Sequence, residues 1–443
     1  MEWEEISKKI DKEELAKLIC EMVDIPSPMG REEELADYLY NRFKQYKRIK
    51  VRKQEVEIGR HNVIATLKGT GEGPTLLYVG HMDTPWGGDE EGIKDFGIGF
   101  QPIARRDGDW IYGVGVFNMQ SGLAAAVYML EILANSDVQL KGDVTVCCVV
   151  GETVHVNVPG MYEGPSYRGT GIGASSMLRY GVTGDMAIAP EPTFGRIVIS
   201  SGGLVYFQIT TWGTPGSTFL GGHQSVERKP EIDAIQKMFK IVEAINEWIP
   251  KYRKSGTYMD ELARNATIIA IHGGLAFRPS KVSPICKLFL EVNTMPGQHN
   301  MDVVQEVEDL VETVRKKDPD MKVDIHTLAT AVGAETSSKE LIVKVLGKYH
   351  KIVTSNESAI TWRGFLADTT ALTRAGIPAV CFGPGGRIRE GGSSYYPREG
   401  EHCYLPDIAD GVKTFIGTSV DICSMTRDEY KKLKPNERGT VIY

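Results

Sequence analysis

Strand-length apolar runs alternate with helical patterns in the first part of the chain and again near its end. TLLYVGHMD and DVTVCCVVG are typical of buried strands, and SGLAAAVYMLEILANS between them is typical of a helix. This alternation constrains the fold strongly, because it requires a largely buried sheet with helices on its faces. Near Ile197 the pattern changes to antiparallel strands, IVISSGGLVYFQITTWG, and a long helix, PEIDAIQKMFKIVEAINEWIPKY. From about Ala334 the alternation resumes.

These changes of pattern divide the chain into two domains. We predict a mixed-sheet α/β domain formed by residues 1–199 together with 332–443. We predict that residues 200–331 form an α+β two-layer domain inserted into the first. Strand runs that alternate with helical patterns favour the α/β class, whereas strand pairs followed by long helices favour the α+β class.

Charge and composition exclude several classes of protein. The 58 Asp and Glu residues outnumber the 51 Lys and Arg residues, giving a formal charge of −7, which argues against a nucleic-acid partner. The N-terminal segment lacks the apolar core of a signal peptide, and we find no run of about 18 apolar residues that would span a membrane. The seven cysteines show no CxxC spacing, as is typical of reduced thiols. We therefore expect a cytoplasmic protein.

Polar residues follow four strand-like segments, and the carboxyl ends of sheet strands form the ligand-binding edge of α/β proteins. His81 follows TLLYVG, with Asp83 two residues later, a spacing that suits a metal ligand and the carboxylate that orients it. The other three are Asn118 after a glycine-rich turn, Glu152 after DVTVCCVVG, and Glu191 between two prolines. Each has an ordinary explanation as a turn, capping or loop residue, but together they indicate a site.

The same segments resemble the motifs of a known family. GHMDT resembles the first histidine motif of the binuclear zinc hydrolases that include aminoacylase, acetylornithine deacetylase, succinyl-diaminopimelate desuccinylase and glutamate carboxypeptidase. GVGVFNMQSGLAAAV is similar to the segment with the family's bridging aspartate, VVGET to its paired glutamates, and APEPT to its later acidic ligand. The resemblance covers nearly the whole chain. It implies a zinc exopeptidase-like catalytic domain with an inserted lid that forms dimers.

The sequence departs from this family at three positions, all on the side of the second metal. Asn118 stands at the bridging aspartate, and Thr153 replaces the second of the paired glutamates. Alignment through Glu401 puts Pro397 at the family's late histidine, while His402 is nearby but out of register. One ion needs no bridging anion, so a neutral Asn oxygen suffices as a weak ligand. We therefore expect a mononuclear site.

The resemblance suggests a role for each residue of the expected site. His81, Glu191 and Asn118 are the expected ligands of one divalent ion, with Asp83 behind His81. Glu152 is the expected general base, which takes a proton from a metal-activated water and returns it to the leaving nitrogen. Because this ligand set is rich in oxygen, we favour Mn²⁺ over Zn²⁺.

Two residues of the inserted domain are candidates for contacting the substrate. GGHQSVERKPEIDAI resembles the family's lid-histidine segment, which would make His223 the donor to the scissile group, although an exposed loop histidine is the competing interpretation. Asn293 stands where the family often has an arginine for a substrate carboxylate, so recognition should differ. The remaining histidines are expected to be structural or solvated, with His155 notable for its position three residues after Glu152.

We therefore predict a metal-dependent hydrolase that cleaves a C–N bond of a small, carboxylate-bearing molecule and assembles through its lid as a homo-dimer or larger homo-oligomer. The reaction that it catalyses is predicted to resemble that of 5-nitroanthranilate aminohydrolase, because an activated aryl carbon needs less help from a second metal. Two alternatives are a divergent aminoacylase, aminopeptidase or deacetylase, and a metal-free pseudoenzyme that binds a small molecule. The three lost ligand positions support the pseudoenzyme, and the retained residues argue against it.

Overall fold

The computed structural model describes residues 3–156, 158, 167–219, 231–260, 262–384, 387, 389 and 400–435. The chain forms two compact units. One contains the residues up to Ser200, Glu335–Thr361 and those from Ala367 on, and the other contains Ser201–Ala334 and Trp362–Leu366. The two-residue strands β9 (Ser200–Ser201) and β16 (Ala334–Glu335) stand where the chain passes from one unit to the other.

The first unit is built on an eight-stranded mixed sheet with the strand order β1-β2-β6-β3-β7-β18-β8-β17. Its central strands β6, β3, β7 and β18 run parallel, and β1 and β2 are antiparallel to their neighbours. Every residue of β3, β6 and β7 is buried, which accounts for their continuous apolar sequences. The strands are β1 (Ile49–Glu57), β2 (Arg60–Leu67), β3 (Leu76–His81), β6 (Val144–Val149), β7 (Met186–Ala189), β8 (Ile197–Val198), β17 (Ile360–Thr361) and β18 (Ala379–Cys381).

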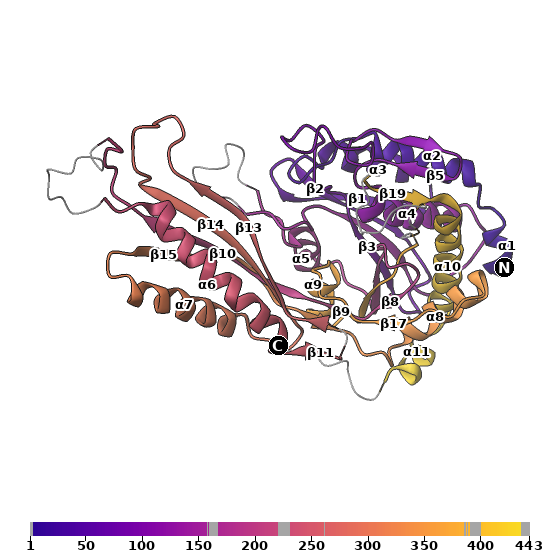
Figure 1. Cartoon of the computed structure of the whole chain (residues 1–443). Coiled ribbons are helices and arrows are strands. Elements are labelled where there is room, and N and C mark those ends of the chain that lie inside the picture. Colours follow the sequence, from indigo (N-terminus) through magenta and orange to yellow (C-terminus); the bar gives the residue numbers. More distant parts are fainter. Residues whose placement is uncertain are drawn as a thin grey trace. The chain divides into compact units, whose positions relative to one another are not determined.

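Helices cover both faces of this sheet (Figure 1). On one face, side chains of α5 and α9 pack with Leu77 and Val79 of β3. On the other face, the buried Tyr78 hydroxyl is 2.9 Å from Ser419 Oγ of α10. All residues of α4 are buried, as expected for a helix that is apolar on every side. The helices are α1 (Trp3–Ser7), α2 (Lys12–Val23), α3 (Glu33–Phe43), α4 (Ser121–Ala134), α5 (Ile172–Arg179), α8 (Leu341–Thr354), α9 (Thr369–Arg374), α10 (Leu405–Cys423) and α11 (Arg427–Leu433), and a small sheet contains β4 (Arg105–Asp107), β5 (Trp110–Tyr112) and β19 (His402–Tyr404).

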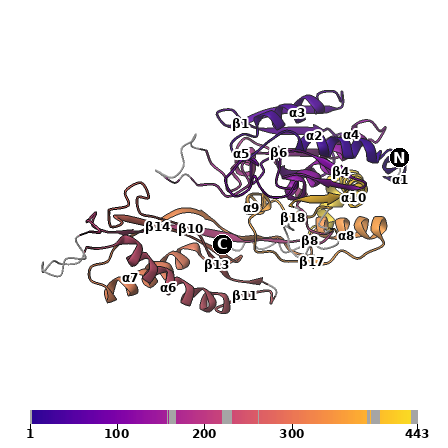
Figure 2. The ribbon, with the colours of Figure 1, turned by 45° about the horizontal axis from the view of Figure 1, so that its top comes forward.

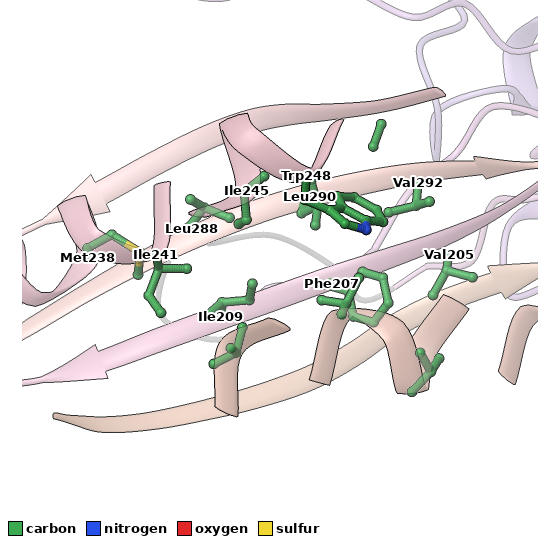
Figure 3. Close-up of a cluster of buried hydrophobic side chains, with 14 of the residues drawn as sticks. Val205, Phe207, Ile209, Met238, Ile241, Ile245, Trp248, Leu288, Leu290 and Val292 are labelled. Carbon is green, nitrogen blue, oxygen red and sulfur yellow. The ribbon is translucent and has the colours of Figure 1, made fainter. Parts of the chain in front are cut away.

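The second unit is a four-stranded antiparallel sheet, β13-β14-β10-β15, with α6 and α7 along one face (Figures 1 and 2). Alternate residues of β10 (Val205, Phe207 and Ile209) point toward the helices and pack with Trp248 of α6 and Leu290 of β14 (Figure 3). This period of two is that of a sheet with one face buried. The elements are β10 (Gly203–Trp212), α6 (Ala234–Lys254), β11 (Thr257–Tyr258), β12 (Leu262–Ala263), β13 (Asn265–Gly273), β14 (Ile285–Thr294), α7 (Asn300–Lys317) and β15 (Lys322–Ala331).

The predicted fold class is confirmed: a mixed-sheet α/β unit is interrupted along the chain by an α+β unit of two layers. All seven cysteines are free, in agreement with the expectation of reduced thiols. The prediction that no membrane-length apolar stretch exists needs one correction. Val116–Ala134 passes that test by length and composition, but 94% of its window is buried inside the protein, as in a core helix.

Candidate active site

His81 is the last residue of β3, and its side chain is buried. Its Nδ1 atom lies 2.9 Å from the backbone carbonyl oxygen of Asp83. Because a carbonyl can only accept a hydrogen bond, Nδ1 carries a proton, and Nε2 is the nitrogen that presents a lone pair when the ring is neutral. Nε2 is buried and has no hydrogen-bond partner among the described residues. The ring is therefore oriented to bind a cation through Nε2.

Two buried carboxylates lie close to this nitrogen. Glu152 Oε2 is 3.8 Å from His81 Nε2, and Glu191 Oε1 is 3.9 Å from it. Both glutamates follow strands that run parallel to β3, since β6 ends at Val149 and β7 ends at Ala189. The carboxyl ends of parallel neighbours meet at one edge of the sheet. The structure thus brings together three of the residues singled out from the sequence.

Asp83 is fully buried beside these residues, but its contacts differ from those expected. The Asp83 carboxylate, expected to orient His81, lies 3.8 Å from Nδ1 of the ring, and the backbone carbonyl of Asp83 makes the hydrogen bond to that nitrogen at 2.9 Å. The carboxylate instead accepts the backbone N–H groups of Glu152 at 3.0 Å and Thr153 at 2.9 Å. The difference arises because a two-residue spacing lets the chain turn back and place the carbonyl against the ring. Asp83 therefore holds both His81 and the Glu152 segment.

The buried acids create a strongly negative environment. Burial by itself would lower the pKa of His81, but the carboxylates of Asp83, Glu152 and Glu191 raise it to about 10. Burial raises the pKa of Glu152 well above its usual range, and the charge of His81 opposes this shift. Burial raises the pKa of Glu191 for the same reason. A site that gathers several acids around one imidazole favours a bound cation.

Asn118 lies in η1 (Val116–Gln120), the segment that precedes α4, and its own backbone is not helical there (φ −118°, ψ 97°). Its backbone N–H and that of Phe117 donate to Oε2 of Glu401, at 3.0 and 3.1 Å. Glu401 is buried, and its Oε1 atom has no hydrogen-bond partner in the described part of the chain. Burial raises the pKa of Glu401 to about 7, and its carboxylate interacts electrostatically with His81. Glu401 therefore fixes the backbone at Asn118, a role that the sequence did not indicate.

Asp368 is a buried acid of this unit that the sequence analysis did not single out. It precedes α9 and is 1% exposed. Burial raises its pKa to about 7, and its carboxylate interacts electrostatically with His81 and Glu191. The sequence signal was weak, because an aspartate followed by two threonines at the start of a helix is typical of an ordinary N-cap.

Two further histidines of this unit are engaged elsewhere. His402 Nδ1 is 3.1 Å from a backbone carbonyl oxygen, and its Nε2 accepts the backbone N–H of Arg389 at 3.3 Å. With one nitrogen donating and the other accepting, His402 has no free lone pair for a metal. His155 stacks on Tyr167, with the ring centroids 4.2 Å apart.

Three other residues named from the sequence are His223, Pro397 and Asn293. His223 and Pro397 fall outside the residues that the structure describes. Asn293 belongs to β14 of the second unit, where its Nδ2 donates to Oε1 of Glu291 at 3.1 Å and its backbone carbonyl accepts the hydroxyl of Tyr252 at 3.0 Å.

The donor set can be tested against a divalent ion. In the described ranges, no group of three or more His, Cys, Asp and Glu side chains is arranged so that it holds an ion as it stands. The distances of 3.8 and 3.9 Å from His81 Nε2 exceed by about half an ångström the roughly 3.4 Å that separates ligands of a tetrahedral zinc ion. The chemistry nevertheless fits, because a buried imidazole lone pair without a partner lies next to two carboxylates.

A buried imidazole and several carboxylates at the carboxyl edge of a mixed sheet define a class of α/β protein suited to metal-assisted hydrolysis. Comparison with known families identifies the family of this chain, because the pattern of Peptidase family M20/M25/M40 matches residues 77–419. The chain belongs to this family. It is a hydrolase that acts on C–N bonds, in a family that is metal-dependent.

Curated relatives match most of the chain. An N-formyl-4-amino-5-aminomethyl-2-methylpyrimidine deformylase from Halalkalibacterium halodurans is 27% identical over 417 residues, covering 86% of this chain and 90% of the relative. A succinyl-diaminopimelate desuccinylase from Corynebacterium glutamicum is 24% identical over 406 residues, covering 88% of this chain and 91% of the relative. Both matches extend across the two units.

Solved structures share the fold. Human carnosine dipeptidase 1 aligns with a TM-score of 0.71 at 12% identity, covering 96% of this chain and 99% of its own. A tripeptidase from Staphylococcus aureus aligns with a TM-score of 0.69 at 17% identity, covering 94% of this chain and 100% of its own. At these identities the likeness concerns the fold alone.

Proposed function

We propose that this protein hydrolyses a C–N bond of a small molecule with the help of one divalent ion held by His81 and Glu191. The observation that carries this proposal is the buried Nε2 atom of His81, which has no hydrogen-bond partner in the described part of the chain and lies 3.8 and 3.9 Å from two buried carboxylates. A bound divalent ion supplies an electrophile and lowers the pKa of a neighbouring water molecule.

Each residue of the site has one task in this reaction. His81 binds through Nε2, because its Nδ1 proton is committed to the carbonyl of Asp83. Glu152 takes a proton from the attacking water and delivers it to the leaving nitrogen. The Asp83 carboxylate positions Glu152 through two backbone hydrogen bonds. Burial keeps bulk water from screening these charges.

The proposal of a single ion rests on the residues that the second ion would need. Asn118 offers a neutral amide where two cations would require a bridging anion, and Thr153 offers no carboxylate. His402 is engaged with the backbone on both nitrogens. The remaining donors are mostly oxygen, so we propose Mn²⁺ in preference to Zn²⁺.

Two kinds of C–N bond are candidates for cleavage. The first is a small-molecule amide, which is favoured by the nearly full-length match to a relative named as a deformylase of an aminomethylpyrimidine. The second is the aryl amine of a 5-nitroanthranilate-like substrate, which is favoured by the reduced ligand set at Asn118 and Thr153. An activated aromatic carbon needs less electrophilic help than an amide carbonyl, so it suits a site with one ion.

The second unit is the proposed source of substrate contacts and of the interface between copies of the chain. We propose that Asn293 hydrogen-bonds a polar group of the substrate, that His223 donates to the scissile group, and that this unit joins two copies of the chain as a homo-dimer or larger assembly. The measurements are the oligomeric mass in solution and the KM of Asn293→Ala. A monomer would contradict the assembly, and an unchanged KM would contradict the role of Asn293.

The central test combines metal content with one substitution. Protein purified without chelators should contain one equivalent of metal per chain, and two equivalents would contradict the single-ion site. Glu152→Gln should lower turnover by about 10²- to 10⁴-fold while the metal content stays the same. Turnover that survives this substitution would rule out Glu152 as the base. No turnover and no metal in the wild type would favour the non-catalytic alternative.

A second experiment decides the substrate class. The wild type is assayed in parallel with the N-formyl aminomethylpyrimidine, an N-succinyl amino acid, a dipeptide and 5-nitroanthranilate, with Glu152→Gln as the control for contaminating activity. Faster turnover of an amide than of the aryl amine would support the first candidate and exclude the second as the principal activity. The reverse order would support the second.

A further inference from the structure

Asp368 stands at an N-cap position without acting as a cap. It is the residue before α9, where an aspartate normally accepts backbone N–H groups of the first turn. Its side chain makes no such hydrogen bond. The residue is 1% exposed, and both carboxylate oxygens are buried without a hydrogen-bond partner among the described residues. A buried carboxylate without a partner is costly, so a group beyond the described residues is needed to satisfy it.

The surroundings of Asp368 are the two segments that carry Glu152 and Glu191. Ala367 packs in one cluster with Ala189, two residues before Glu191. On the other side lies Gly171, where an added Cβ atom would be 3.9 Å from Oδ1 of Asp368. The backbone N–H of Gly171 donates to the carbonyl of Glu152 at 3.2 Å. Asp368 is thus held next to both strand ends that form the candidate site.

The expected ligand set contains one anion fewer than the family's, because Asn118 replaces an aspartate. Asn118 is neutral, so among the ligands expected from the sequence only Glu191 is an anion. A divalent ion in a buried environment is stabilised by carboxylates around it, including those that do not touch it. Asp368 is a buried acid with no partner in the described part of the chain, and its charge acts on His81.

We propose that Asp368 belongs to the cation site, where its carboxylate offsets the charge of the ion bound by His81 and Glu191 and replaces the charge that Asn118 lacks. This inference rests on the proposed metal-dependent function. It also explains why Asp368 does not cap α9, since a carboxylate engaged by backbone N–H groups would be less available to a cation.

A role in the cation site predicts two effects of substituting Asp368, one on the stability of the metal-free protein and one on the affinity for the metal. A purely structural residue would not show both. Without metal, Asp368 is a buried acid near other acids and has no hydrogen-bond partner in the ranges that the structure describes, so Asp368→Asn should raise the melting temperature of the metal-free protein. With metal, the same substitution should weaken the affinity for Mn²⁺ by about 10- to 100-fold and reduce the thermal stabilisation that saturating Mn²⁺ gives. Asp368→Ser, which retains a capping side chain, should show the same loss of affinity.

Glu131→Gln is the matched control. Glu131 is also a buried acid, but it is paired with Arg42 at 2.6 and 2.9 Å. Its substitution should lower the melting temperature of the metal-free protein and leave the Mn²⁺ affinity unchanged. The readouts are melting of chelator-treated protein and the Mn²⁺ dissociation constant from competition with a fluorescent chelator.

The outcomes separate this inference from the function on which it rests. If Asp368→Asn and Asp368→Ser bind Mn²⁺ within about twofold of the wild type while His81→Ala loses binding, Asp368 has no part in the site and the proposed function stands. If the wild type binds no divalent ion, both proposals are overturned. A weaker affinity together with a more stable metal-free Asp368→Asn protein supports the inference, and a weaker affinity with a less stable one assigns Asp368 a structural role and overturns it.

Discussion

The carboxylate of Asp83 accepts the backbone N–H groups of Glu152 at 3.0 Å and Thr153 at 2.9 Å, while its own backbone carbonyl lies 2.9 Å from Nδ1 of His81. One residue therefore fixes the tautomer of the expected metal ligand and the position of the expected base. The first task belongs to the backbone and the second to the side chain, so a substitution separates them.

Asp83→Asn should loosen the Glu152 segment. An Asn side chain has one acceptor oxygen for two N–H groups, and its amide group would face the other N–H. We expect faster hydrogen exchange at Glu152 and Thr153, and activity and metal affinity that are each lower by about 10- to 100-fold. Exchange should stay slow in β3, because the carbonyl that holds His81 remains. Unchanged exchange at Glu152 would contradict the role given to the carboxylate.

The buried pair of Glu131 and Arg42 offers a test of stability away from the site. Glu131 lies in the wholly buried helix α4, and the Arg42 guanidinium bonds both of its oxygens at 2.6 and 2.9 Å. Arg42→Met should destabilise the protein by about 3–5 kcal/mol, because it leaves a buried carboxylate without its cation. The measurement is urea unfolding of the full chain. The double variant Arg42→Met/Glu131→Leu should recover most of the loss, and equal instability of both variants would show that the charge is not the cause.

The positions of the site residues were predictable because each signal is local in the sequence. In the sequence, His81 stands at the end of an apolar strand-like run, and Glu152 and Glu191 each follow such a run within a few residues. Polar residues in these positions identify the carboxyl edge of a parallel sheet. The fold class followed for the same reason, since β3, β6 and β7 are apolar throughout. The structure places these three strands side by side.

Other features depended on contacts between distant segments. Asp368 has the sequence signature of a helix cap, and only its burial without a partner in the described chain distinguishes it. The hydrogen bonds that the Glu401 carboxylate accepts from the backbone N–H groups of Phe117 and Asn118 join residues 284 and 283 positions apart. The use of the Asp83 carbonyl in place of its carboxylate depends on the exact course of a turn. Sequence spacing alone carries none of this information.

Asp318 should make the stability of the second unit depend on pH. It follows α7, and its carboxylate accepts hydrogen bonds from Lys237 at 2.7 Å and Lys240 at 2.8 Å. These bonds lower the pKa of Asp318 below its ordinary value of 3.8. Because the folded pKa is lower than the unfolded one, the stabilisation is present above pH 3.8 and disappears as the pH falls through the folded value.

The comparison that checks this is wild type against Asp318→Asn. At pH 7 the substitution should cost about 1–2 kcal/mol, and the difference should narrow steadily below pH 4. Hydrogen exchange of peptides from α6 and α7 reports the second unit separately from the first. A difference that stays constant down to pH 3 would mean that the ionised carboxylate is not its source.

Removal of the metal should destabilise the first unit. An ion that binds only the folded state adds about 2.7 kcal/mol of stability when its concentration is one hundred times the dissociation constant. The expected result is a lower unfolding midpoint after treatment with a chelator and full recovery with Mn²⁺. His81→Ala should show neither effect, because the Nε2 atom without a hydrogen-bond partner is the proposed nitrogen ligand. Asn293→Ala, in the other unit, is the control and should respond to the metal like the wild type. A metal response that persists in His81→Ala would place the ion elsewhere in the chain.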